Sequence, residues 1–390
     1  MRKAIVFLLF TTYGFAQSVT KTINLLPDTG QNLSYTNTFG EDNDYTINVP
    51  SYINNGNGTI TDNVTGLMWE QTDGGEMTIE NAFIYADNLV LGGFSDWRLP
   101  NPMESFSILN HQNNNPAMNT TFFTASVAEY WWTNAFQAGD NTKVWCTNAG
   151  GGIGNKPKSE TISAGGTFKF HVRAVRDIAA PTIIANHFTN NVNGTITDNL
   201  TQLIWQKVPN TSVLTWENAL SYAENLALAS ATDWRLPNIK ELQSLNDEST
   251  INPSVSTTFF PTIGARNYWS STSLPNQTTK AWYCNTQFGI TTYDTKTNSN
   301  YTICVRGNPA VLGLNSIDLK SKIKVYPNPF SSKITIENAA ENETYQLCNE
   351  IGQYVFIGKN IENQDFSSLP KGNYFLRING QTNPSIKLIK

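Results

Sequence analysis

The sequence has few charged residues and no run of lysine or arginine. Charged residues occupy 15% of its 390 positions, and the formal net charge is −5. Capture of DNA, RNA or an anionic membrane depends on a basic surface, which this composition does not supply. We therefore expect no nucleic-acid partner.

Long apolar runs are missing as well. After the first residues, no stretch reaches the roughly 20 apolar residues that a membrane-spanning helix needs. The start is basic (Met1-Arg2-Lys3), then apolar over a short stretch (Ala4–Phe10), and small residues precede Gln17. This order is typical of a secretory signal peptide, which we place at residues 1–16. The prediction is an exported protein with no transmembrane segment.

Histidine and cysteine are scarce, with three and four copies. The cysteines form no C-x-x-C pair, so a zinc site is not expected. His111, His171 and His187 lie outside the repeated motifs described below, and neither H-E-x-x-H nor G-x-S-x-G occurs. The sequence thus predicts no catalytic residues and no cofactor.

What the sequence does contain is an internal duplication. "NGTITDNVTGLMWEQ" at 57–71 returns as "NGTITDNLTQLIWQK" at 193–207, and "DWRLPN" stands at both 96–101 and 233–238. The period is too long for a solenoid unit and indicates two copies of one domain. We predict domains at 24–177 and 186–307, a linker at 308–320 and a different domain at 321–390.

Each copy predicts an α+β fold. A strand runs into an Asx-type turn and a second strand that ends at Trp69 or Trp205. A helix follows with apolar residues at i, i+3, i+4 and i+7, capped by Thr78 in copy one and Thr215 in copy two. The remainder reads as a small antiparallel sheet with long loops. Second short helices are expected around 104–109 and 241–245, with Asn101 and Asn238 as their caps.

The last part of the chain has a different pattern. After "KVYPNPF" at 324–330, short alternating strands such as "KITIEN" are separated by Pro, Asn and Gly turns. This pattern predicts a small β-sandwich.

The repeated DWRLPN motif allows two interpretations. Its Asp and Arg could form a catalytic or ligand-holding pair, or the motif could be a structural joint. We favour the joint, because tryptophan is highly buried on average and buried arginines are paired. The guanidinium would then stack on the indole and bind the motif's own aspartate or loop carbonyls. The structural set is Trp69, Asp96, Trp97 and Arg98 in copy one, and Trp205, Asp233, Trp234 and Arg235 in copy two.

Several ordered motifs together resemble one bacterial family. "NGTITDN" with a following tryptophan, "DWRLPN", "YWSST" and a final "AVR" or "CVR" are similar to the Lcl C-terminal domain, also called DUF1566. The resemblance covers residues 26–176 and 188–306. It implies a C-type-lectin-like fold for each copy, and some members of the family are adhesins that bind host or matrix glycans.

The tail resembles a second family. "VYPNPF" and "LPKGNYFLRI" are similar to the type IX secretion C-terminal sorting domain of Bacteroidetes. This resemblance implies the type IX secretion machinery as a partner, export across the outer membrane, and release or attachment at the cell surface.

Two cysteines distinguish copy two. Cys284 and Cys304 stand where copy one has Thr147 and Ala174, so they are present or absent together. For an oxidising destination we predict a Cys284–Cys304 disulfide. The other two cysteines are then expected as buried thiols.

The lectin-like resemblance implies that long loops after the Tyr-Trp strand carry the ligand. Amide and carboxylate side chains suit sugar hydroxyls, and an aromatic face stacks on a pyranose. The alternative is an ordinary solvated loop. The candidates are Trp131, Gln137, Asp140, Asn141 and Lys143 in copy one, and Asn276, Gln277, Tyr293, Asp294 and Lys296 in copy two.

Two minor alternatives concern a bound calcium ion and a sulfated sugar as ligand. Calcium would need oxygen ligands such as Asp140, Asn141 or Asp294, yet no EF-hand spacing is present. The acidic net charge favours neutral sugars over sulfated ones. A sulfated ligand would need a basic patch from Lys156, Lys158, Lys169 and Arg173.

Together with the patterns above, the two resemblances imply a secreted or cell-surface binding protein of adhesin type that recognises glycans or surface partners. Two tandem copies favour avidity. The alternatives are a secreted enzyme on a fold related to formylglycine-generating oxidases, and a purely structural surface protein. Against the enzyme alternative, copy one has no counterpart of the reactive cysteine pair that such an oxidase would need.

Overall fold

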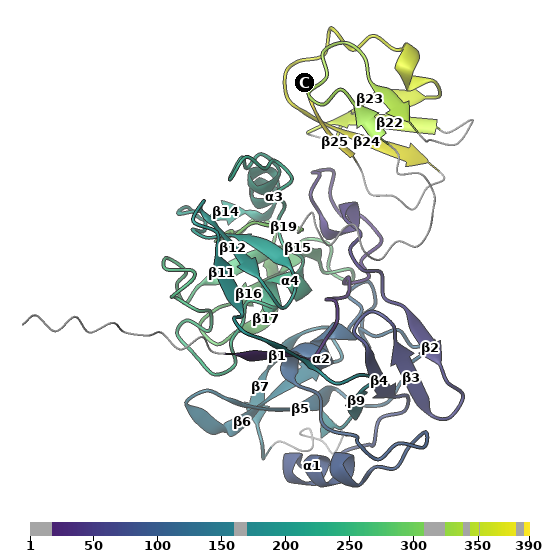
Figure 1. Ribbon diagram of the computed structural model, residues 1–390, viewed down its shortest axis with the longest axis vertical. Helices are drawn as coiled ribbons and strands as arrows, with labels where there is room; N and C mark the ends of the chain where they lie inside the picture. The colour runs from purple at the N-terminus through teal and green to yellow at the C-terminus, as the bar shows by residue number, and fades with distance from the viewer. Residues whose placement is uncertain (1–17, 160–169, 308–323, 338–343, 351, 380–385) are drawn as a thin grey trace, which may run out of the picture.

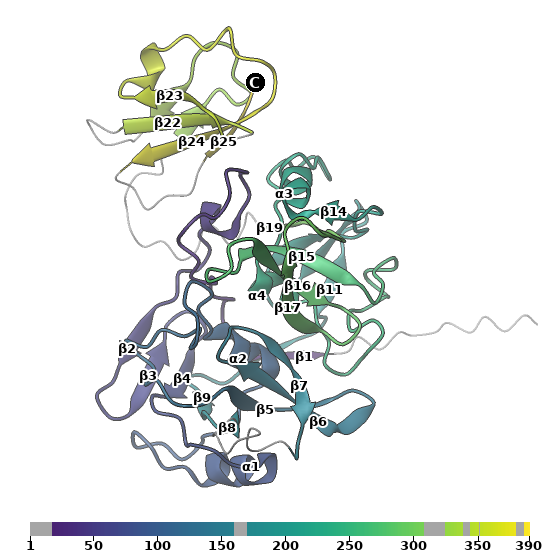
Figure 2. The ribbon, with the colours of Figure 1, turned by 180° about the vertical axis from the view of Figure 1, so that it is seen from behind.

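The computed structural model describes residues 18–159, 170–307, 324–337, 344–350, 352–379 and 386–390. Figures 1 and 2 show repeat 1 (residues 52–177), repeat 2 (188–307) and the C-terminal domain in that order along the long axis. The described part is rich in strands with few helices, which is compatible with the predicted α+β class. The predicted signal peptide (1–16) and linker (308–320) lie outside the described residues.

Each repeat begins with the same four-stranded antiparallel sheet, ordered β2-β3-β4-β9 in repeat 1 and β11-β12-β13-β19 in repeat 2. Trp69 lies opposite Val175, and Trp205 lies opposite Val305, so the register is also duplicated. Both tryptophans are fully buried. The strands are β2 (Tyr52–Asn54), β3 (Thr59–Asp62), β4 (Leu67–Glu70), β9 (Val175–Asp177), β11 (Phe188–Asn190), β12 (Thr195–Asp198), β13 (Leu203–Gln206) and β19 (Val305–Gly307).

A second sheet follows in each repeat, ordered β7-β6-β5-β8 and β15-β16-β17. The strands of this sheet and the turns beside them carry the residues that the sequence suggested as ligand contacts. Repeat 2 also has the two-stranded pair β14 (Leu214–Thr215) and β18 (Ser299–Asn300). The other strands are β5 (Tyr130–Gln137), β6 (Asp140–Asn148), β7 (Ile153–Pro157), β8 (Phe170–His171), β15 (Asn267–Ser273), β16 (Lys280–Asn285) and β17 (Ile290–Thr295).

Two helices lie in each repeat: α1 (Ile79–Asn88) and α2 (Pro102–Ser107), then α3 (Trp216–Glu224) and α4 (Ile239–Gln243). Thr78 accepts the N–H of Asn81 (3.3 Å) and caps α1 as predicted. Thr215 makes no side-chain cap bond, which corrects the second prediction. Thr215 is the last residue of β14, where its backbone pairs with β18.

The repeats pack against each other through equivalent elements. Helix α2 lies against α4, and β7 lies beside β17. Trp145 and its counterpart Trp282 belong to one cluster of buried side chains. The N–H of Ile153 donates to Thr291 Oγ1 (2.9 Å) across the boundary. Because the same elements face each other, the contact is isologous, like that of a twofold dimer within one chain.

A segment outside the duplication, the N-terminal arm (residues 22–48), runs between the repeats. Just before it, β1 (Val19–Lys21) pairs with β10 (Thr182–Ile184) of the segment that joins the repeats. The short helix η1 (Asp42–Asp44) of the arm then meets repeat 2, where Thr272 Oγ1 donates to Asp42 (2.6 Å). The arm precedes repeat 1 in sequence but is bound by both repeats.

The C-terminal domain combines a two-stranded sheet, β20-β21, with a four-stranded sheet, β23-β22-β24-β25, over one core. It meets the arm, where Phe375 stacks on Phe39 with ring centroids 3.6 Å apart and Arg377 pairs with Asp44. The β-sandwich stays a prediction. The elements are β20 (Lys324–Tyr326), β21 (Thr335–Glu337), β22 (Thr344–Asn349), β23 (Tyr354–Gly358), η2 (Ile361–Asn363), β24 (Asn373–Asn379) and β25 (Ile386–Ile389).

Candidate ligand-binding cleft

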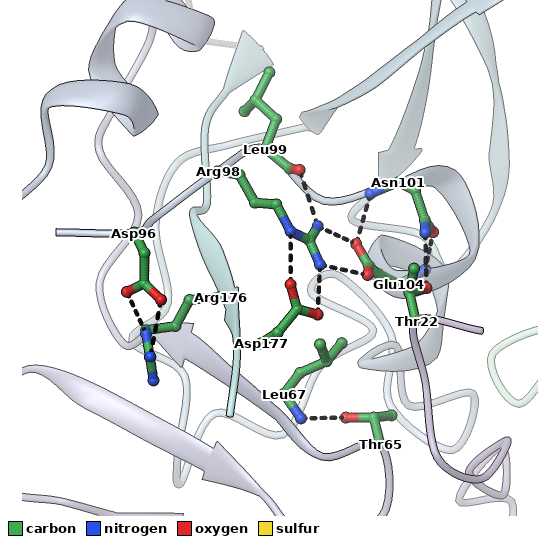
Figure 3. Close-up of polar contacts among 10 residues, drawn as sticks. All are labelled: Thr22, Thr65, Leu67, Asp96, Arg98, Leu99, Asn101, Glu104, Arg176 and Asp177. Carbon is green, nitrogen blue, oxygen red and sulfur yellow. Dashed lines mark hydrogen bonds and ion pairs between the residues drawn. The ribbon is translucent and has the colours of Figure 1, made fainter. Parts of the chain in front are cut away.

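The arginine of each DWRLPN motif is held by a glutamate on the helix that follows. Arg98 donates to both carboxylate oxygens of Glu104 (2.7 and 2.8 Å) and also to Asp177 (2.9 and 3.2 Å) (Figure 3). Arg235 forms the same fork with Glu241 (2.6 and 2.5 Å). Each glutamate also accepts the backbone N–H of the asparagine that caps its helix. The arginine therefore ties the strand end to the helix start.

The motif's aspartate has a different partner from the expected one. Asp96 accepts two bonds from Arg176 (2.7 and 2.9 Å) (Figure 3), and the second copy repeats this pair. The backbone of Arg98 pairs with Val175, which brings Arg176 beside Asp96 and Asp177 beside Arg98. Of the two predicted partners of the motif arginine, the motif's own aspartate is wrong, whereas a loop carbonyl holds for Arg98, which donates to the carbonyl of Leu99 (3.3 Å). The indole stack is wrong as well: the ring beneath the guanidinium of Arg235 is that of Tyr45 (5.4 Å), and the guanidinium over Phe94 is that of Arg176 (3.8 Å).

The motif tryptophans complete the joint. Trp97 is 3% exposed and its Nε1 donates to the carbonyl of Leu91 (3.2 Å); Trp234 is 1% exposed and bonds the equivalent Leu228 (3.1 Å). On the other side of the joint, Asn101 Nδ2 donates to the hydroxyl of Thr22. In both copies the motif is built into the scaffold and fixes where the next helix begins.

The predicted Cys284–Cys304 disulfide is not formed. All four cysteines lie in the described residues, and all are free and buried. Cys284 and Cys304 enter different clusters of core side chains, and Cys284 Sγ donates to Gln243 Oε1 (3.6 Å). Their joint presence in copy two therefore reflects two separate packing positions. Burial raises the pKa of the Cys284 thiol to about 12.

Trp131 is not a stacking platform. It is 4% exposed, packs in the core of repeat 1 and donates its Nε1 to Asp73 (3.1 Å). Its neighbour Trp132 enters a different core cluster and is fully buried. Strand β5 is covered on both faces, so neither tryptophan can meet a ligand.

The other predicted ligand residues of repeat 1 lie at the tip of the β5–β6 hairpin. Gln137 is 7% exposed and therefore buried there. Asp140 pairs with Lys143 (3.2 Å) and accepts from Thr142, while Asn141 is exposed. This is a hairpin tip held by local contacts.

The candidates of repeat 2 are spread over a larger surface. Asn276 and Gln277 are exposed in the turn between β15 and β16. Tyr293 is 41% exposed, and the ammonium of Lys280 lies 4.9 Å from its ring centroid. Asp294 instead binds its own loop, through Asn298 Nδ2 (2.7 Å).

Lys296 is structural. Its side chain is buried, with Nζ 3.9 Å from the ring centroid of Trp216 and a bond to the carbonyl of Tyr35. Burial lowers its pKa. It therefore fastens the N-terminal arm to repeat 2 and is not available to a ligand.

The basic patch considered for sulfated ligands is not assembled. Arg173 is 2% exposed and donates to two backbone carbonyls of repeat 1. Lys158 pairs with Glu80 (3.7 Å), Lys156 lies over Tyr130, and Lys169 falls outside the described residues. In the described part of the chain, no three His, Cys, Asp or Glu side chains are grouped to hold a metal.

A cleft of about 910 Å³ lies between the repeats. Its walls come from β1 and the start of the arm, the first turn of α2, strand β11 and the segment after α4. No predicted ligand residue lines it. The apolar part of the lining includes Met103, Phe188, Leu245 and Phe259.

The polar part of the cleft is mostly acidic or neutral. Asp247 and Glu248 stand on one wall, and burial raises the pKa of Glu248. Lys21 stands on another wall, and burial lowers its pKa. His187 Nε2 lies 3.4 Å from Asp198 Oδ1. Little in the sequence points to this cleft, because its walls come from the unduplicated N-terminus and from positions where the copies differ.

His171 lies beside a buried carboxylate, which its position outside the repeated motifs did not suggest. His171 Nδ1 lies 2.8 Å from Asp73 Oδ1, and Ser126 donates to the other oxygen of that carboxylate (2.5 Å). His171 Nε2 is buried without a hydrogen-bond partner among the described residues. The group is 4% exposed, so it faces the interior of repeat 1.

The comparisons with known proteins agree with this duplicated architecture. Residues 58–176 and 194–306 both match the Lcl C-terminal domain, together more than half of the chain. The chain belongs to the Lcl C-terminal domain family. In this Lcl-domain protein, residues 324–390 also match the secretion system C-terminal sorting domain. No curated protein and no solved structure matches the chain.

The sorting domain assigns a location. A chain of the Lcl family that ends in this domain is a secreted or cell-surface protein, with the secretion machinery as a partner. Among the described residues, no helix is long and apolar enough to cross a membrane.

Proposed function

We propose that this Lcl-domain protein is an adhesin-like binding protein and that its main ligand enters the cleft between the repeats. The supporting observation is the cleft itself. Its volume of about 910 Å³ lies at the upper end of the range of small-ligand pockets, and its lining mixes apolar and hydrogen-bonding side chains. Glycans and surface partners are the ligand classes, and a lectin-like fold of the repeats stays part of the proposal.

Binding is favoured over catalysis. A general acid or base must reach its substrate within hydrogen-bond distance. The Asp73–His171 pair is buried, and repeat 2 has Tyr301 next to Tyr268 where repeat 1 has His171 next to Trp131. The duplicated part of the fold therefore carries no shared acid–base pair among its described residues.

A glycan has a second candidate surface on repeat 2. Tyr293 is the exposed aromatic side chain among the predicted ligand residues that the structure describes. Asn276 and Gln277, in the turn at the start of the same hairpin, offer amide groups. A pyranose could replace the Lys280 ammonium on the tyrosine ring, since both interact with the aromatic face.

The test is binding of the purified protein to a glycan array and to extracts of surface proteins. Ser249→Trp would fill the cleft from an exposed wall, with Ser221→Trp on the exposed face of α3 as its matched control. We expect Ser249→Trp alone to remove ligands of the cleft. Tyr293→Ala should remove glycans of the second surface, with Tyr354→Ala in the C-terminal domain as control. Ligands that bind equally to all four variants would contradict the proposal.

A further inference from the structure

The cleft has a counterpart in repeat 1, because the two repeats are related by an approximate twofold axis. Val64-Thr65 in "DNVTG" corresponds to Leu200-Thr201 in "DNLTQ". Asn110 corresponds to Asp247, since each N–H donates to the equivalent carbonyl, of Ala117 and of Ser254. The counterpart groove is therefore defined residue by residue.

The counterpart groove is occupied by the N-terminal arm. The N–H groups of Asn24 and Leu25 donate to the carbonyls of Thr65 (2.8 Å) and Val64 (3.2 Å). Further along, the N–H of His111 donates to the carbonyl of Thr29 (2.8 Å). In this groove these three bonds to repeat 1 use the main chain of the arm, which is how extended peptides are recognised.

A lysine completes the hold on the arm. Lys240 Nζ donates to the carbonyl of Asp28 (2.8 Å) and to that of Ser107 (2.7 Å). Lys240 is fully buried, so these two carbonyls surround its charge. Its counterpart in repeat 1 is Met103, which lines the open cleft.

Equivalent main-chain groups face the cleft. No described backbone group donates to the carbonyls of Leu200 and Thr201. The N–H of Glu248, the counterpart of His111, has no described backbone acceptor and bonds the carboxylate of its own side chain. All three residues line the cleft and are partly exposed. Repeat 2 has no second arm, because the short segment before β11 contains β10, which pairs with β1.

We propose that the cleft binds an extended polypeptide segment of a surface partner, in the way that its counterpart binds the arm. This rests on the proposed function, which places the ligand in the cleft. The side chains also select the segment. Met103 and Phe259 suit an apolar residue, and Asp247 and Glu248 suit a lysine or arginine a few positions further along. Lys21 is the lysine of the described cleft lining, and its charge interacts favourably with the carboxylate of Asp198.

The experiment uses the full chain and a fluorescein-labelled peptide with the sequence of residues 23–33 carrying Thr29→Lys. Fluorescence anisotropy should show saturable binding that a scrambled peptide does not reproduce. Glu248→Lys should weaken it by about tenfold or more, because it reverses a charge beside the peptide's lysine. Glu248→Gln should have a smaller effect. Glu80→Lys, an equal charge change on the exposed side of α1, should have none.

Thermal unfolding of each variant separates loss of binding from loss of fold. The inference is overturned if the peptide does not bind, or if folded Glu248→Lys binds it as the unchanged protein does. A glycan that binds and is lost in Ser249→Trp would keep the cleft as the ligand site but overturn the polypeptide ligand. If Ser249→Trp changes the binding of no peptide, glycan or surface extract, the proposed function of the cleft fails too.

Discussion

Lys240 shows how much a single position can differ between two copies of a fold. Met103 holds the equivalent place in repeat 1, while Lys240 is fully buried and joins repeat 1, repeat 2 and the arm through two carbonyls. Burying an ammonium is costly unless it is neutralised or well bonded. Burial lowers the pKa of Lys240 to about 8, although nearby Asp28, Asp62 and Asp42 act against this.

Lys240 should therefore give a pH-dependent stability with a defined sign. Between pH 8 and 10.5 the folded chain releases a proton that the unfolded chain keeps, so the free energy of unfolding rises with pH over this window. The contribution is at most about 3 kcal/mol. Lys240→Met, which copies repeat 1, should remove this rise. Urea unfolding at pH 8 and pH 10 measures it, and an identical rise in both proteins would refute the assignment.

At the scale of elements, the second helix of each repeat depends on its cap. Helix α4 has five residues, too few to be stable by itself. Asn238 accepts the N–H of Glu241 (2.9 Å), and Glu241 accepts the N–H of Asn238 in return. This capping box is duplicated at Asn101, so it belongs to the fold.

Removing the cap should destabilise the chain in a way that a matched control does not. Asn238→Ala leaves one backbone N–H of α4 without its acceptor and should lower the free energy of unfolding by about 1 kcal/mol. Thr215→Ala stands at the equivalent position before α3 but makes no side-chain cap bond, so it should change stability by only a few tenths of a kcal/mol. Chemical denaturation of both variants tests this, and equal losses would show that the cap bond is not the cause.

Helices and strands that depend on the spacing of neighbouring residues could be predicted from the sequence. Contacts between residues far apart in the sequence could not. Repeated motifs at a constant spacing predicted the duplication and the tryptophan near the end of β4. A cap residue followed by helical spacing predicted the helix after Thr78. The predicted asparagine caps of the second helices are confirmed, but these helices begin directly after the caps and so earlier than predicted. Asp96 and Arg176 lie 80 residues apart, and nothing local connects them. The sign that was available is that both copies keep both residues.

At the scale of the whole molecule, the path of the N-terminal arm determines which of the two equivalent grooves stays open. Its path between the repeats fills one of two equivalent grooves, and no periodicity in residues 22–48 could reveal that path. The arm also meets the C-terminal domain through Phe39 and Asp44. The cleft is therefore a property of the assembled chain, and the candidates chosen on single repeats do not line it.

Glu224 lies where repeat 2, the arm and the C-terminal domain meet. Its Oε1 accepts the hydroxyl of Tyr45 (2.5 Å), its Oε2 is buried without a hydrogen-bond partner among the described residues, and its backbone carbonyl accepts from Lys387. Burial raises the pKa of this carboxyl to about 7. The junction therefore holds a carboxyl that is largely protonated in mildly acidic solution.

The sign of the resulting pH dependence follows from linkage. Between pH 4.5 and about 7 the folded chain keeps a proton that the unfolded chain releases, so this group's contribution to stability is lost as pH rises. The side chain introduced by Glu224→Gln cannot ionise. The free energy of unfolding of this variant should therefore be about 1–3 kcal/mol higher than that of the unchanged chain at pH 8, and nearly the same at pH 4.5. Tyr45→Phe, which removes the hydroxyl donor but keeps the ring, is the control and should not be more stable at pH 8. Urea unfolding at both pH values decides the matter: a Gln variant that is less stable at pH 8 would mean that the carboxylate is charged and paired at this junction.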